Sequence, residues 1–74
     1  MTHTKEQVEK MRDAAMTQRA KVSAIHHDIF MAEETDTIEL LGLAYELQHA
    51  SIELCTRMKW LANATRDLAE ELAA

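Results

Sequence analysis

The chain has 74 residues, with 8 basic and 13 acidic side chains, which gives a net charge of −5 when the histidines are neutral. This length excludes a multidomain protein, and we expect residues 1–74 to form a single domain. One Gly and no Pro leave few residues suited to the turns of a sheet protein, so the composition predicts an all-α fold. The acidic balance argues against a dedicated binder of nucleic-acid backbones.

A single cysteine, Cys55, excludes an internal disulfide and therefore a disulfide-stapled secreted domain. Polar and charged residues fill the start of the chain, where a signal peptide needs an apolar run. No stretch approaches the roughly 18 apolar residues that a membrane span requires. We therefore expect a cytoplasmic protein that makes no contact with a membrane.

The first predicted helix covers about residues 5–33. Thr4 and Gln7 have the spacing of a capping box at its start. Apolar residues then alternate at spacings of three and four, which is typical of a coiled-coil seam. This seam consists of Val8, Met11, Ala15, Gln18, Val22, Ile25, Ile29 and Ala32. We expect its one polar member, Gln18, to fix the register between helices.

Residues 34–36 interrupt the periodicity and predict a turn. Asp36 and Glu39 then predict a second capping box, at the start of a helix over about residues 37–72. Leucines recur along it at every seventh position, namely Leu40, Leu47, Leu54, Leu61 and Leu68. If these occupy the d positions of a heptad, the a positions hold Ala44, Ser51, Met58, Thr65 and Leu72. The pattern predicts a two-helix antiparallel hairpin; a bent continuous helix is the alternative, because the break contains no Gly or Pro.

The first half of the second helix is apolar around more of its circumference than one neighbouring helix covers. We name the excess surface the outer stripe, which consists of Ile38, Leu41, Tyr45, Gln48, Ile52 and Cys55. Beyond Cys55 the same side of the helix becomes basic, with Lys59 and Arg66. We expect the outer stripe to form a dimer interface, so that two hairpins make a four-helix bundle. A different protein covering the same stripe is the alternative.

Charged residues form a second regular pattern. The first helix carries a basic line of Lys5, Arg12, Arg19 and His26. Folding the chain at residue 36 predicts contacts of Arg19 with Glu53, His26 with Glu46, Arg12 with Trp60 and Lys5 with Asp67. Alternatively, the basic line is the RNA-facing surface of a helical-hairpin dimer, a hypothesis that the net charge of −5 disfavours.

Glu46 and His49 have the Glu-x-x-His spacing of di-iron carboxylate bundles, so a metal-binding bundle is a further alternative. Both residues lie on the predicted polar face opposite the leucines, which favours a solvated surface instead. Nucleophile loops, phosphate-binding glycine loops and zinc-type Cys/His spacings are absent from the sequence. We therefore expect no catalytic residue, no cofactor and no resident metal, and a protein that is not an enzyme.

Five residues are candidate contacts for another protein, namely Arg57, Lys59, Trp60, Phe30 and Met31. Trp and Arg are enriched at interface hot spots, although Trp60 would also fit as a cover over Arg12. Phe30 and Met31 either cap the bundle near the turn or form part of a docking patch. The expected function is that of a homodimeric hairpin that binds an unidentified protein. By analogy alone, it suits a regulator or inhibitor of a larger protein or complex, including phage- or plasmid-encoded ones.

Overall fold

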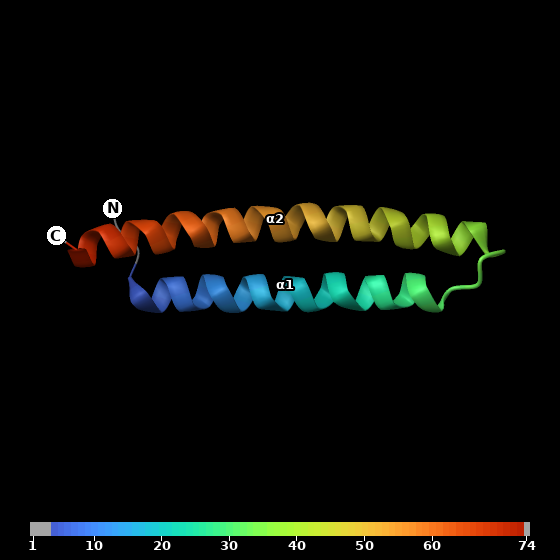
Figure 1. Cartoon of the computed structure of the whole chain (residues 1–74), viewed down its shortest axis with the longest axis horizontal. Helices are drawn as coiled ribbons and strands as arrows, with labels where there is room; N and C mark the ends of the chain where they lie inside the picture. The colour runs from blue at the N-terminus through green and yellow to red at the C-terminus, as the bar shows by residue number, and fades with distance from the viewer. Residues whose placement is uncertain (1–3, 74) are drawn as a thin grey trace.

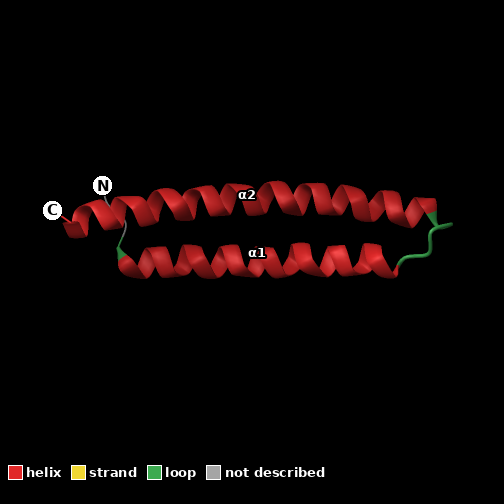
Figure 2. Cartoon of the chain, viewed as in Figure 1, coloured by secondary structure: helices red, strands yellow, loops and turns green. Residues whose placement is uncertain are grey.

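The protein is a two-helix hairpin, as seen in a computed structural model that describes residues 4–73. Helix α1 (Lys5–Met31) and helix α2 (Thr37–Ala73) run antiparallel, side by side, and are connected by residues 32–36 (Figure 1). The Cα atoms span 58 × 14 × 14 Å. Helices and loops account for all the described residues (Figure 2). The predicted all-α hairpin is confirmed, and residues 1–3 and 74 of the predicted domain lie outside the described part.

Both helices begin at predicted caps. Thr4 Oγ1 accepts a 3.1 Å hydrogen bond from the Gln7 N–H, and Gln7 Oε1 accepts one of 2.9 Å from the Thr4 N–H. This confirms the first capping box. At α2, Asp36 Oδ1 accepts from the Glu39 N–H at 3.1 Å, whereas the Asp36 N–H donates to the Glu33 carbonyl at 3.0 Å. Asp36 is therefore a cap, but the predicted second capping box is incomplete, because the Asp36 N–H is satisfied by Glu33 within the turn and not by the Glu39 side chain.

The end of α1 differs from the prediction by two residues. The helix stops at Met31 instead of about residue 33, because Ala32 adopts an extended backbone with φ −70° and ψ 146°. The Ala32 N–H donates to the Ile29 carbonyl at 3.3 Å and closes the last turn. The connection is therefore residues 32–36 and not 34–36.

On α1, the predicted seam faces α2, and Ala15, Gln18, Val22 and Ile25 are buried. On α2, the d-position leucines are half-buried, but the expectation for the a positions is wrong at four of the five, and only Ser51 is half-buried. Ala44, Met58, Thr65 and Leu72 are exposed, and the residues that face α1 stand one position earlier: Leu43, Ala50, Arg57 and Ala64. Because the leucine row stays in the seam and only its neighbouring row changes to the residues one position earlier, the helix is rotated by about 50°, half of the 100° that separates successive residues. The physical reason is that the earlier residue is the more apolar one at three of these places, Leu43, Ala50 and Ala64.

The core between the helices is thin. Ala15 and Ala64 are fully buried, while the central cluster consists of Val22, Ile25 and Ala50 with half-buried Ile29, Leu47 and Leu54 packed against it. Gln18 crosses the seam, and its Nε2 donates a 2.9 Å hydrogen bond to the Ala50 carbonyl. This contact places residue 18 opposite residue 50, so the chain folds about residue 34, the centre of the observed turn, and not about residue 36.

The acidic residues at the start of α2 should make the stability of the hairpin depend on pH. The pKa of Glu39 is raised above its ordinary value of 4.5, first by a side-chain hydrogen bond with Asp36 and then by repulsion from Asp36, Glu33 and Asp28. A raised carboxyl pKa means that this group stabilises the fold at low pH, and that this stability is lost as pH rises through the folded-state pKa. Glu39→Gln mimics the protonated form, so it should raise the thermal midpoint at pH 7.

The difference between Glu39→Gln and the parent chain should shrink as the pH falls below about 4.5, where both side chains are neutral. Gln is compatible with the cap, because Gln7 occupies the same position in the box of α1. Glu9→Gln, an exposed site on α1, controls for the change in net charge. Thermal unfolding followed by circular dichroism from pH 3 to pH 8 makes the comparison; a midpoint shift that does not depend on pH would contradict it.

Candidate interaction surface

The outer stripe lies on the side of α2 that α1 does not cover. Tyr45 stands two residues before Leu47, which packs toward α1, and Ile52 stands two before Leu54. Two residues along an α-helix correspond to a rotation that leaves the side chains about 160° apart. Helix α2 therefore has two apolar faces, one against α1 and the other almost opposite to it.

All six residues of the outer stripe are exposed in a single copy. Ile38 retains 86% of its accessible surface, Leu41 57%, and Tyr45 and Ile52 58% each. Isolated apolar residues are common on protein surfaces, whereas a continuous row is typical of an interaction site. The spacings of three and four residues along this row match those of a helix-packing seam.

An open cleft of about 390 Å³ borders the stripe. Lys21 and Ile25 of α1 form one wall, and α2 contributes the residues that complete the lining, Tyr45, Glu46, His49, Ala50 and Glu53. Tyr45 thus belongs to both the stripe and the cleft. Sequence reasoning did not identify Lys21, whose position beside the seam becomes informative only when the rotation of α2 is known.

The rotation of α2 also explains why the predicted ion pairs differ. Lys21 lies with Glu46 and Glu53 along the cleft, in place of the predicted His26 and Arg19. Glu53 pairs with Arg57 of its own helix at 2.9 Å, and Arg12 lies 3.6 Å from its neighbour Asp13. The basic line of α1 therefore does not determine the register of the hairpin at these positions. The register contact is that of Gln18 with Ala50.

Glu46 and His49 both line the cleft, which places the di-iron-like pair at the boundary between the two helices. Within residues 4–73, no three side chains of His, Cys, Asp or Glu are arranged to hold a metal ion. Helix α1 contributes Lys21, a cation, and apolar Ile25 to the cleft beside the pair, whereas a di-iron site needs a carboxylate there.

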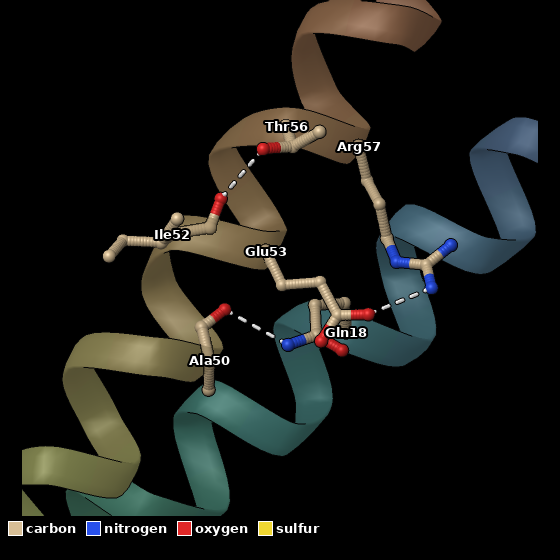
Figure 3. Close-up of polar contacts among 6 residues, drawn as sticks. All are labelled: Gln18, Ala50, Ile52, Glu53, Thr56 and Arg57. Carbon is tan, nitrogen blue, oxygen red and sulfur yellow. Dashed lines mark hydrogen bonds and ion pairs between the residues drawn. The ribbon is translucent and has the colours of Figure 1, made fainter.

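Arg57, a candidate partner contact, lies in the seam between the helices. Its side chain is 36% exposed and donates from Nη2 to Glu53 Oε1 at 2.9 Å, while Nε is buried without a hydrogen-bond partner in the described structure. Figure 3 shows the Arg57 and Glu53 side chains extending from α2 toward α1, near Gln18. Arg57 therefore offers less of its side chain to a partner than its sequence position suggests.

The other candidate contacts are exposed. Trp60 retains 56% of its surface and lies on the side of α2 that carries Glu46 and Glu53, while Lys59 continues the line of Tyr45 and Ile52. Phe30 and Met31, in the last turn of α1, are 84% and 66% exposed. They do not cap the two-helix core, so in a single hairpin they form an apolar patch at the turn.

Comparison with known proteins identifies no relative. No protein-family model matches the chain, and no curated protein or solved structure is significantly similar to it. Neither helix, over the residues described, combines the length and apolar character that crossing a membrane requires.

Proposed function

We propose that this protein is a non-enzymatic interaction module, a helical hairpin that pairs with a second copy through the outer stripe and presents the resulting dimer to another protein. The observation that carries the proposal is the outer stripe, an exposed row of five apolar residues and Gln48 about 160° from the face that α1 covers. In this dimer the two α2 helices form the centre and each α1 lies outside, which gives four helices in all.

The accessible surface of one copy supports self-association. It amounts to 5889 Å², whereas an unfolded chain of 8.4 kDa exposes about 12,200 Å². Folding alone thus removes about half of the surface, less than the roughly 60% typical of a domain of about 60 residues. An interface of ordinary size, about 800 Å² per partner, would raise the buried share to about 58%. A second copy therefore supplies the burial that one hairpin lacks.

Light scattering coupled to size-exclusion chromatography at micromolar concentration tests the proposal. A dimer has twice the 8.4 kDa of one chain, about 17 kDa. A folded particle of 8.4 kDa, stable by circular dichroism and without a partner, would refute self-association. Such a result would leave the outer stripe to a different protein.

A regulator or inhibitor of a larger protein is the role that suits a small helical dimer with a large exposed side chain available for docking. Trp60 is the best candidate for the contact residue, because it is large, exposed and outside both apolar faces of α2. Blocking a surface of the larger protein requires only that the hairpin dock there.

Trp60→Ala should weaken the recovery of a partner from a lysate of the native host by at least about tenfold, which corresponds to about 1.4 kcal/mol. Helicity and dimer mass should remain unchanged, because Trp60 lies outside the stripe. Affinity capture with quantitative mass spectrometry measures the recovery, and Met16→Ala, an exposed apolar site on α1, is the matched control. Equal recovery with both variants would show that the docking surface lies elsewhere.

A further inference from the structure

The side of α2 that carries the outer stripe changes character along its length. From Ile38 to Ile52 it is apolar, and the next residues on the same line are exposed Lys59 and Arg66. The opposite charge gathers where the hairpin turns, at exposed Glu33, Glu34, Asp36 and Glu39. The hairpin is therefore acidic at its turn, whereas the stripe side of α2 is apolar in its first half and carries two cations, Lys59 and Arg66, in its second half.

This order of charges discriminates between the two directions in which a second copy can pack. A parallel two-fold dimer is in register, so every residue of the stripe meets its own counterpart. Lys59 would then approach Lys59 of the partner subunit, and the four turn acids would approach the same four acids. Like charges placed together oppose association, and opposite charges favour it.

We infer that the two copies pack α2 against α2 in opposite directions, with the two-fold axis beside Gln48. The acidic turn of each hairpin then meets the basic second half of the partner's helix. This inference rests on the proposed self-association and adds its direction and register.

The position of the axis follows from the apolar part of the stripe. Reversing α2 about residue 48 pairs residues whose numbers sum to about 96. Leu41 then lies beside Cys55 of the partner subunit, and Ile38 lies level with the aliphatic part of Lys59 of the partner subunit, the next residue on the stripe side. Gln48 meets the partner's Gln48, and two primary amides can each donate to and accept from the other. The only amide in the stripe is therefore placed where an identical amide satisfies it.

The same register aligns the charges. Lys59 of the partner subunit comes level with residue 37, between Asp36 and Glu39, and the partner's Arg66 lies about 10 Å further along, beside the turn. Helix α2 beyond this overlap extends past the partner on both sides. Residue 73 lies about 38 Å from the axis, so the dimer would be about 75 Å long. A parallel dimer would keep the 58 Å length of one hairpin.

Single-cysteine variants test the direction, because a disulfide requires Cα atoms within about 7 Å. The wild-type chain has Cys55 alone. Leu41→Cys combined with Cys55→Ser carries one cysteine at position 41, and Gln48→Cys combined with Cys55→Ser carries one at position 48. All three positions are exposed in a single copy, so the hairpin should fold in every variant, which circular dichroism checks. Cys55→Ser alone is the control for adventitious oxidation products.

After mild oxidation, the position-48 variant should form a disulfide dimer. The wild-type chain and the position-41 variant should each stay uncrosslinked alone, yet form a heterodimer when mixed, identified by intact mass. Small-angle X-ray scattering of the reduced wild-type dimer should give a maximum dimension well above that of one hairpin.

Two results would overturn the inference, and they differ in what else they overturn. Disulfide dimers of the wild-type chain alone and of the position-41 variant alone, without the mixed product, indicate parallel packing and leave self-association intact. No crosslink at any position, together with a particle of 8.4 kDa, would refute both the direction and the proposed dimer.

Discussion

Ile52→Glu should raise the dissociation constant of the dimer by at least about 100-fold. Burying an isoleucine side chain contributes about 1.5–3 kcal/mol, and two-fold symmetry counts each substitution twice, so about 3–6 kcal/mol is lost. At about 1.4 kcal/mol per factor of ten, this loss corresponds to a change of about 10²–10⁴ in affinity. The new carboxylates would also face an apolar surface without a partner charge, which adds to the effect.

Sedimentation equilibrium over a concentration series measures this dissociation constant. Met16→Glu is the matched control, since it makes a similar apolar-to-acid change at a 43% exposed site on α1, away from the stripe. The control should dimerise as the wild-type chain does, and its helicity should be unchanged. Equal affinities for the two variants would mean that the outer stripe is not the interface.

Local signals in the sequence were sufficient for the helices and their starts. Thr4 and Asp36 act through side-chain oxygens that reach backbone N–H groups three residues away, so their effect is visible in a short window of sequence. The end of α1 lacks such a marker. No Gly or Pro ends the helix, and the two-residue difference at Met31 arises from the geometry of the turn instead.

The rotation of α2 could not be predicted from the leucines alone. A row at every seventh position specifies one edge of the seam and leaves either neighbouring row to complete it. Comparing the two rows pair by pair favours the earlier row at Leu43, Ala50 and Ala64, but Arg57 and Glu71 contradict the rule, since each stands beside a more apolar residue. The contacts between charged residues depend on this rotation and on the position of the turn. For this reason Lys21, and not the predicted His26 and Arg19, lies beside Glu46 and Glu53.

The outer stripe was predictable because it depends on how many apolar residues surround the first half of α2, and not on the register between the two helices. Whichever row completes the seam, the apolar residues from Ile38 to Cys55 exceed what α1 covers, and all six stripe residues are exposed. By contrast, the cleft beside Lys21 requires both helices to be placed, and sequence reasoning did not find it. A surface that belongs to one helix can therefore be predicted from its sequence, whereas a site formed between two helices also requires their relative placement.

The second large effect concerns Gln18, the buried polar residue of the seam. Gln18→Ala should lower the free energy of unfolding by about 2–3 kcal/mol. The change removes a side chain that is 7% exposed, together with its 2.9 Å hydrogen bond to the Ala50 carbonyl. A net hydrogen bond contributes about 0.5–1.5 kcal/mol, and the unfilled space beside Val22 and Ala50 accounts for the rest.

Gln18→Leu separates volume from hydrogen bonding. Leucine refills most of the space, and the Ala50 carbonyl keeps its bond within α2, so no backbone group is left unsatisfied. This variant should therefore remain within about 1 kcal/mol of the wild-type chain. Urea unfolding of both variants at one fixed protein concentration measures the difference. If Gln18→Leu were as destabilised as Gln18→Ala, the polar contact across the seam, and not the filling of space, would be what stabilises the hairpin at its centre.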